Sequence, residues 1–416
     1  MLKNQWKSLS ELESLQNNKL QKLIHHAYNN VPYYRHLFDS VGLKPYEINS
    51  VEDLARIPIT SKKQLQNSSL DEIVDRNVNL SKCVRITTSG STGIPLRLFY
   101  TRGDFSTLNM NWIRPLLIYG VKPWHKRLEI TGPHNISNKK KWYNYLGLWN
   151  NKMISLFKSP QEWVNMLHYY KPDILYGYSG SLKLLAKYVL DNEIININPK
   201  FIFGVSELVD DECRELIYKA FKKKLIDLYG AAEAGCIAWQ CKICNGYHIN
   251  MDTVIVEFLQ GDQPASPGTH GRIIVTNLHS FAMPIMRYEL GDIGIPSKEK
   301  SLCERELSLM EVVEGRSDAF VVLPSGNLLS PLFFFGIMKP IKEIEHWKVF
   351  QRDIKHLTIF IVPSKDFSSN TINHIKQRVE ENIGEKMEIK VELVEKIPVD
   401  SSGKVRTVIS QVKSPF

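Results

Sequence analysis

A stretch of nine residues, 87–95, is built mainly from glycine and hydroxyl side chains and carries no charge. It lies between residues 83–86 and 96–100, two segments whose patterns predict short strands. Glycine lets the backbone approach a ligand closely, successive N–H groups can surround an anion, and hydroxyls add neutral donors. A flexible turn is the ordinary alternative. We predict a phosphate-binding loop with these contact residues: Thr88, Ser89, Gly90, Ser91, Thr92 and Gly93.

This loop is not the P-loop of mononucleotide kinases. That motif needs two glycines five positions apart with Lys directly after the second. Gly90 and Gly93 are only three positions apart, and no Lys follows them. The chain must therefore hold phosphate in another way.

Two further motifs could complete a nucleotide site, although each has an ordinary explanation when taken alone. Ser206 and Glu207 follow Gly204 after a predicted strand, which also suits a strand-to-helix turn. Tyr229 begins the run Tyr-Gly-Ala-Ala-Glu, which ends at Glu233. An aromatic ring before a tight turn can stack on a base, and the carboxylate beyond it can hold a divalent cation. The alternative for Glu233 is an exposed loop acid.

Three motifs follow nearer the C-terminus. Asp292, at a glycine turn, can accept both hydroxyls of a ribose, or it is simply a hairpin acid. Arg316 can reach a phosphate or ribose, and the small residues around Asp318 suit a hinge. Lys404 follows Gly403 in a polar loop, for which a solvated tail is the alternative.

Taken in order, these motifs resemble the signature of the adenylate-forming superfamily. The phrase at residues 26–35 and the ending at 402–410 resemble its phenylacetate–CoA ligase and CapK-like branch. The resemblance implies that a carboxylate attacks the α-phosphate of ATP, giving an acyl-adenylate and pyrophosphate. A thiol, first of all that of coenzyme A, then takes the acyl group. The alternative acceptors are a carrier-protein thiol, an amine or a hydroxyl.

The resemblance also implies roles for the motif residues. The loop would cradle the β- and γ-phosphates, Glu233 would hold Mg²⁺, and Asp292 with Arg316 would bind the ribose. Lys404 would neutralise charge on the α-phosphate in the transition state, on a small domain that rotates near Asp318. The adenine pocket would be formed by the following residues: Ser206, Glu207, Tyr229, Gly230, Ala231 and Ala232.

One position departs from the pattern. Many superfamily members have Lys after the proline of the loop, whereas here Leu96 and Arg97 follow Pro95. Arg97 or Arg102 would have to replace it, or the loop would hold phosphate through its backbone alone.

A possible zinc site lies in the middle of the chain. Cys241 and Cys244 have the C-x-x-C spacing of metal ligands, His248 follows, and Cys303 lies downstream. Some relatives in the branch carry a structural zinc near here, and four such ligands would make a closed site. Free cysteines in a surface hairpin are the alternative.

The acyl substrate is the part that the sequence defines least. Its pocket should lie between the loop and Tyr229, with these candidate residues: Trp112, His134, Tyr176 and Tyr178. Ordinary core aromatics explain each of them equally well. An aromatic carboxylic acid is suggested by the resemblance alone, and no motif identifies a coenzyme A tail.

The elements that must position these residues predict an α/β fold. Strands expected at 128–131, 174–177, 201–204 and 225–229 alternate with helices, which predicts a largely parallel sheet with ligands at its carboxyl edge. We expect a helical cap (1–80), an α/β core (81–250) and an antiparallel strand-rich subdomain (251–316). Together they form an N-terminal adenylation domain, 1–316. A mobile α+β domain, 317–416, follows, with a helix capped by Thr371.

Composition limits the remaining choices. The net charge is +9, and we interpret the basic runs as isolated and the charge as dispersed, which disfavours a nucleic-acid-binding protein with a zinc knuckle. No apolar run reaches the length of a membrane span, and the N-terminus lacks the apolar core of a signal peptide. Six cysteines do not suggest a disulfide framework. We therefore predict a cytoplasmic protein, with a homodimer among its possible assemblies.

Overall fold

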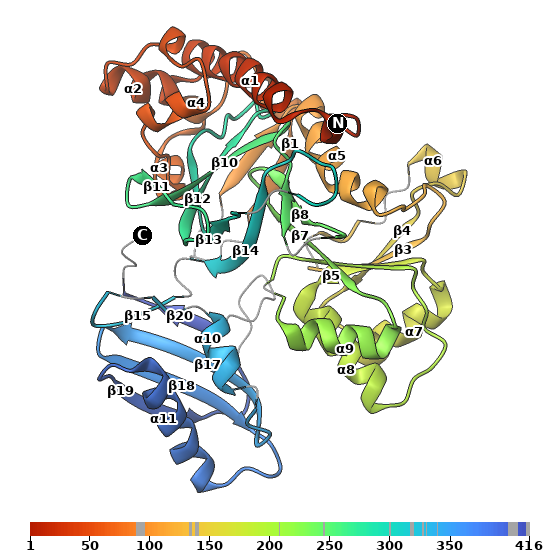
Figure 1. Cartoon of the computed structure of the whole chain (residues 1–416). Coiled ribbons are helices and arrows are strands. Elements are labelled where there is room, and N and C mark those ends of the chain that lie inside the picture. The colour runs from red at the N-terminus through yellow and green to blue at the C-terminus, as the bar shows by residue number, and fades with distance from the viewer. Residues whose placement is uncertain are drawn as a thin grey trace.

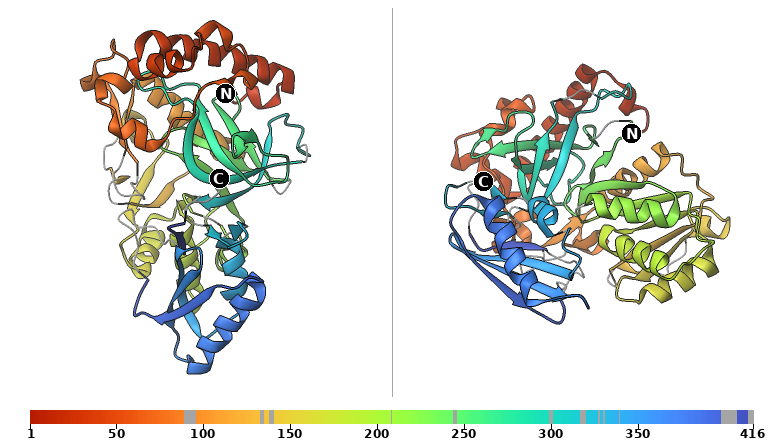
Figure 2. Two further views of the ribbon diagram at one scale, coloured as in Figure 1. Left: turned by 90° about the vertical axis from the view of Figure 1, so that its left-hand side faces the viewer. Right: turned by 60° about the horizontal axis from the view of Figure 1, so that its bottom comes forward.

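The computed structural model of the chain describes residues 1–88, 96–132, 135–137, 141–207, 209–243, 246–298, 301–316, 320–326, 328–329, 331–338, 340–397 and 407–412. A helical cap lies over a large mixed sheet, and a smaller domain projects from the opposite end (Figure 1). Figure 2 shows from two further sides that this domain, formed by the C-terminal residues, extends away from the cap. The expected fold, a mixed α/β body with a small C-terminal domain, is confirmed.

The large sheet contains twelve strands in the order β11-β10-β12-β13-β14-β9-β8-β7-β6-β5-β3-β4. Its parallel part is formed by β3 (Arg127–Thr131), β4 (Asn151–Ser155), β5 (Ile174–Tyr178), β6 (Phe201–Val205) and β7 (Leu225–Ala231). Its antiparallel part is formed by β8 (Gly235–Gln240), β9 (Tyr247–Ile249), β10 (Val254–Gln260), β11 (Gln263–Pro264), β12 (Gly271–Asn277), β13 (Tyr288–Pro296) and β14 (Leu309–Arg316). A separate hairpin joins β1 (Val84–Thr87) to β2 (Arg97–Tyr100).

The antiparallel strands of residues 251–316 and the parallel strands of the core belong to one sheet. The strand β8 pairs antiparallel with β7 on one side and with β9 on the other, so that one hydrogen-bonded sheet continues through both regions. In the sheet order β14, β9 and β8 lie between β13 and β7, which are about sixty residues apart in the chain.

Helices cover both parts of the body. Those of the cap are α1 (Leu9–Asn30), α2 (Pro32–Ser40), α3 (Lys62–Asn67) and α4 (Leu70–Ile73), with short 3₁₀ helices η1 (Asn4–Trp6), η2 (Pro45–Glu47), η3 (Glu52–Arg56) and η4 (Leu80–Lys82). Those of the sheet are α5 (Arg102–Ile118), α6 (Trp142–Tyr145), α7 (Pro160–Tyr170), α8 (Ser179–Asp191) and α9 (Asp211–Phe221). The Asp210 side chain caps the start of α9, because it accepts from the N–H of Cys213.

The cap is held to the sheet by apolar burial. Leu20, Leu23 and Ile24 on one face of α1 are fully buried and form one cluster with Leu278 and Met286 from the sheet side. Ser8 begins α1 through a capping box with Glu11.

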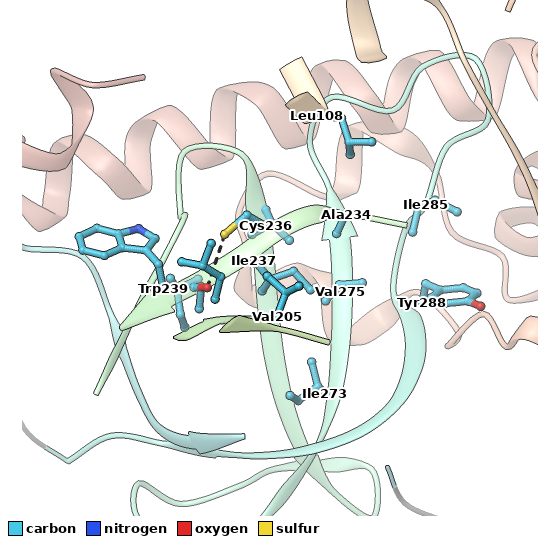
Figure 3. Packing of buried hydrophobic residues seen from close by; sticks show 14 of the residues in the cluster. Leu108, Val205, Ala234, Cys236, Ile237, Trp239, Ile273, Val275, Ile285 and Tyr288 are labelled. Atoms are coloured by element: carbon cyan, nitrogen blue, oxygen red, sulfur yellow. Dashed lines mark hydrogen bonds between the residues drawn. The ribbon is translucent and has the colours of Figure 1, made fainter. Parts of the chain in front are cut away.

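The main core lies beneath the expected nucleotide site. Figure 3 shows Val205 of β6, Ile237 of β8, and Ile273 and Val275 of β12 in one cluster, with Leu108 of α5 above them. All five side chains are buried. A close-packed core of this kind resists local movement, so the strand ends that leave it have well-defined positions.

The C-terminal domain has its own core and sheet. The sheet order is β19-β18-β17-β20, formed by β17 (Ile344–Asp353), β18 (His356–Pro363), β19 (Glu388–Leu393) and β20 (Val408–Ser410). Beside it lie β15 (Val321–Val322), β16 (Leu328–Leu329), α10 (Pro331–Met338) and α11 (Ser369–Ile383). The prediction that Thr371 caps the last helix is wrong, because Ser368 is the N-cap and the Thr371 side chain accepts from its N–H. The helix does end at Gly384, which has a left-handed backbone.

A buried amide connects both ends of this domain. The Gln351 side chain accepts from the N–H of Val322 at 2.8 Å and donates to the Val322 carbonyl at 2.7 Å. The hydroxyl of Ser410 also donates to Gln351 Oε1, at 2.7 Å. Gln351 is fully buried, so it replaces a backbone partner for both segments. The segments that follow residues 317–319 and 398–406 are therefore both bonded to β17.

Candidate functional site

The described residues at the base of the hydroxyl-rich loop, Thr88 and Leu96, are hydrogen-bonded to each other and close the hairpin. The N–H of Thr88 donates to the Leu96 carbonyl at 3.0 Å, and the N–H of Leu96 donates to Thr88 Oγ1 at 2.9 Å. The predicted strands on both sides are present as β1 and β2. Ser89, Gly90, Ser91, Thr92 and Gly93 lie outside the described residues.

The strand that leaves the loop is bonded directly to the turn of Glu233. The Tyr100 hydroxyl, at the end of β2, donates to the carbonyls of Ala232 at 2.8 Å and Glu233 at 3.2 Å. The Asn277 side chain donates to the same Glu233 carbonyl at 2.9 Å. The turn between β7 and β8 is thus held from two sides, and its position relative to the loop base is set by hydrogen bonds.

The Glu233 carboxylate is buried, contrary to the alternative of an exposed loop acid. Its Oε1 accepts from the Tyr288 hydroxyl at 3.3 Å. Burial raises the pKa of Glu233 above its usual range, and the negative charge of Asp292 raises it further. The Tyr288 hydrogen bond and the positive charge of Lys62 oppose that increase. A desolvated carboxylate in this position is stabilised by any cation that binds beside it.

Tyr229 and Asp292 meet at the same place. The Tyr229 hydroxyl donates to Asp292 Oδ2 at 2.8 Å, which joins β7 to β13 across the sheet. The sheet register places Asp292 opposite Arg316 on β14. Tyr229, predicted for the adenine, and Asp292, predicted for the ribose, are therefore neighbours.

Close backbone packing accounts for two glycines near this site. A Cβ on Gly230 would lie 2.6 Å from the indole of Trp112, so the α5 aromatic is packed against the Tyr-Gly-Ala-Ala turn. A Cβ on Gly180 would lie 2.7 Å from Glu207 Oε2, which accepts from the Gly180 N–H at the start of α8. Trp112 thus reaches the turn of Tyr229, as its assignment to the pocket requires.

Ser206 has an unusual backbone conformation. Its φ is +70° and its side chain is exposed, directly after β6. A non-glycine residue in the left-handed region carries a conformational cost that the surrounding structure must hold in place. This strained turn lies at the carboxyl edge of the parallel strands, where open α/β sheets bind ligands.

The other pocket candidates are distributed less closely. Tyr176 packs on Phe203, with ring centroids 6.4 Å apart, and the Arg127 guanidinium lies 5.2 Å from its ring centroid. Tyr178 ends β5 opposite Val205. His134, Asp318 and Lys404 lie outside the described residues. A substrate role for Tyr176 and Tyr178 stays a prediction.

Cys303, which lies far downstream in the sequence, comes close to Cys241 and His248. Cys241, His248 and Cys303 are all buried, with ligand atoms within 4.8 Å of one another. Cys303 Sγ lies 3.1 Å from His248 Nε2. Cys244 lies outside the described residues. Three of the four predicted ligands therefore converge from segments more than fifty residues apart.

The chemistry of these three groups suits a zinc ion. Burial lowers the pKa of His248 to about 4, so the imidazole is neutral at neutral pH. Burial would raise the pKa of Cys303, but hydrogen bonds from Ser301 and Arg305 outweigh it and lower the pKa. His248 Nδ1 is buried without a hydrogen-bond partner among the described atoms. Thiolate and neutral imidazole are the ligands that zinc prefers.

Sequence reasoning missed three residues of this site. Tyr100, Tyr288 and Lys62 were given no role, because a hydroxyl or lysine far from a motif carries no local signal. Lys62 lies at the start of α3, which contacts β13, and its charge acts on Glu233. Lys62 lies four residues after Pro58, and no motif surrounds it.

Comparison with known proteins defines the class first. The fold is that of the adenylate-forming acyl-CoA ligases. A 2-hydroxyisobutyryl-CoA ligase in the postadenylation state matches with a TM-score of 0.80, 18% identity, 98% of this chain and 91% of its own. The open structure of that ligase, with 2-HIB-AMP and CoA, matches with a TM-score of 0.67.

Sequence relatives then narrow the branch. Residues 321–411 match the model of the CapK C-terminal domain. Protein CapK of Staphylococcus aureus is 24% identical over 97% of this chain and 90% of its own. The phenylacetate-coenzyme A ligases of Thermus thermophilus and Escherichia coli are 24% and 25% identical, over 82% and 77% of this chain and 78% and 75% of their own. The chain is thus a homologue of CapK and of the phenylacetate–CoA ligases.

The bond between β2 and the Glu233 turn can be tested directly. We predict that Tyr100→Phe, which removes one hydroxyl and leaves two buried carbonyls with fewer donors, lowers local stability by about 1 kcal/mol. Amide hydrogen exchange in residues 229–234 should become faster. Tyr119→Phe, which removes a hydroxyl bonded to Gln240, is the matched control. Unchanged exchange at 229–234 in Tyr100→Phe would contradict the prediction.

Proposed function

We propose that the chain activates a carboxylic acid with ATP and transfers the acyl group to a thiol, first of all that of coenzyme A. The carboxylate attacks the α-phosphate, an acyl-adenylate forms, and pyrophosphate leaves. The thiol sulfur then attacks the acyl carbon, AMP leaves, and a thioester forms. The observation that carries this proposal is the buried Glu233 carboxylate, bonded through its turn to the strand that leaves the hydroxyl loop.

The described residues would have different roles in the first step, the formation of the acyl-adenylate. Glu233 would hold Mg²⁺, which neutralises the phosphates and suits a carboxylate ligand. Asp292 would accept the ribose hydroxyls, oriented by its hydrogen bond from Tyr229. Phosphoryl chemistry depends on positioning and charge neutralisation more than on covalent catalysis, and these groups supply both.

Lys62 would take the place of the lysine that is missing after Pro95. It carries the positive charge that acts on Glu233, and it stands beside β13 rather than on the loop. A cation there can interact with the phosphates that the loop cradles. Arg97, our earlier candidate, lies on β2 with an exposed side chain.

The C-terminal domain would bring Lys404 to the α-phosphate and then withdraw it. Gln351 supports this because it holds the strand after residues 398–406 and the segment after 317–319 in one unit. A ligase of the same fold has been solved in more than one state, and this chain superposes better on its postadenylation state.

Groups other than the thiol of coenzyme A are also candidates for the acyl acceptor. Protein CapK aligns over more of this chain than the phenylacetate–CoA ligases do, and its C-terminal domain model matches here. A carrier-protein thiol, an amine or a hydroxyl therefore stays an alternative to coenzyme A as the acyl acceptor. An aromatic acid is the first substrate to try, because the phenylacetate–CoA ligases are relatives.

The activity is tested by ATP–pyrophosphate exchange across a panel of carboxylic acids. We expect exchange with at least one acid, and Lys404→Ala should reduce it by roughly a hundredfold or more while ATP binding persists. Thioester formation with coenzyme A is measured separately. Exchange with no acid would reject the activity, and full exchange in Lys404→Ala would reject the role of that lysine.

The role of Lys62 has a matched control in its neighbour. We predict that Lys62→Ala lowers the exchange rate roughly tenfold or more, because a charge beside the phosphates is lost. Lys63→Ala removes the same charge from an exposed position on the same helix and should change little. Equal effects of the two substitutions would contradict the assignment.

The metal site has a test that is independent of activity. Purified protein should contain about one zinc per chain by elemental analysis. Cys303→Ser should lower the zinc content and the melting temperature together, whereas Cys83→Ser, at a cysteine outside the cluster, should change neither. A stable protein that contains no zinc would remove the site.

A further inference from the structure

Lys and Arg are spread along the chain, but the net positive charge is concentrated in one segment where acidic residues are few. Residues 122–171 contain nine Lys or Arg and only two Asp or Glu, so they hold seven of the nine net charges of the whole protein. Eight of the nine cations are lysines. This segment forms the β4 edge of the sheet with α6 and α7 (Figure 1).

The same segment exposes large apolar side chains. Trp142, Tyr145 and Leu146, on and after α6, are 74%, 76% and 65% exposed. Trp124 is 63% exposed and Tyr169 is 77% exposed. Contiguous exposed aromatics of this size are uncommon on a surface without a partner.

Hydrogen bonds and ring contacts place these groups together. The N–H of Trp149 donates to the Pro123 carbonyl, and Asn144 of α6 donates to the Leu148 and Trp149 carbonyls, which holds α6 beside the turn of Trp124. The Lys152 ammonium lies 4.5 Å from the ring centroid of Tyr169, at the end of α7. We call the following residues the aromatic–lysine patch: Lys122, Trp124, Lys126, Lys141, Trp142, Tyr145, Leu146, Lys152, Tyr169 and Tyr170.

The patch lies at the opposite edge of the sheet from the nucleotide site. Arg127 pairs with Asn151 where β3 and β4 begin, next to the patch. Glu233 follows β7, and Ser206 follows β6, at the other ends of the parallel strands. A partner bound at the patch would therefore leave the nucleotide site open to its substrates.

We propose that the aromatic–lysine patch is a docking surface for an anionic lipid bilayer. Aromatic rings and long lysines are the side chains that suit the bilayer interface, where rings enter the headgroup region and ammonium groups meet lipid phosphates. None of the helices in the described part of the chain combines the length and apolarity that a bilayer crossing requires, so contact is peripheral.

Two other anionic partners, an acidic protein and a single-stranded nucleic acid, fit the patch less well. Protein interfaces are depleted in lysine and enriched in arginine, whereas all four cations of the patch, Lys122, Lys126, Lys141 and Lys152, are lysines. Single-stranded nucleic acid binds by stacking bases on aromatic faces. The faces of Tyr170 and Tyr169 are approached by lysine ammonium groups, since Lys126 and Lys152 lie 5.3 and 5.1 Å from the Tyr170 centroid.

Vesicle sedimentation tests the proposal with the full chain. We expect binding to vesicles of phosphatidylcholine mixed with phosphatidylglycerol, weak binding to phosphatidylcholine alone, and a decrease with added salt. Lys122→Glu with Lys141→Glu should weaken binding about tenfold or more. The same reversal at Lys355 and Lys365, exposed on the C-terminal domain, is the charge-matched control.

The aromatic contribution is tested in the same assay. Trp142→Ser with Tyr145→Ser should weaken binding at all salt concentrations, whereas Tyr46→Ser with Tyr218→Ser, at exposed sites elsewhere, should not. Melting temperatures confirm that each variant folds. Absence of vesicle binding, or equal binding by patch and control variants, would overturn the proposal. Binding to polyuridylate or to an acidic carrier protein, but not to anionic vesicles, would reassign the patch.

Discussion

The desolvation of one carboxylate is the constraint on which the rest of the site depends. Glu233 is buried, and its pKa is raised, so the free energy of the fold improves when a hydroxyl or a cation lies beside it. Tyr288 supplies the hydroxyl, and Lys62 supplies a positive charge. The backbone of the same turn is bonded by Tyr100 and Asn277. Loop base, cap and sheet therefore all meet at this turn.

One continuous sheet carries both ends of the contact between Tyr229 and Asp292. Asp292 on β13 accepts a hydrogen bond from Tyr229 on β7, although β14, β9 and β8 lie between the two strands in the sheet order. The same continuity brings Cys303 to the hairpin of Cys241. The nucleotide site and the metal site thus both depend on strands of the same sheet.

Local patterns predicted the regular elements well. Alternation and turn residues identified the strands that became β3, β5, β6 and β7, because each is a short apolar segment ended by glycine or an acid. The start of the last helix was misplaced by three residues, since Ser368 and Thr371 can both act as caps and only the capping box distinguishes them. The continuity of the parallel and antiparallel strands had no local signal, because strand pairing depends on residues far apart in the chain.

The sequence by itself determined the ordered motifs, the α/β class and the resemblance that implies acid activation, because these depend on residue types and short spacings. Only the tertiary structure decided that Glu233 is buried rather than exposed and that Tyr229 bonds to Asp292. It alone also decided that α3, which carries Lys62, contacts β13 and that lysines and aromatics share one edge. The physical reason is that burial, charge proximity and pairing are properties of distance in space, which a linear sequence does not contain.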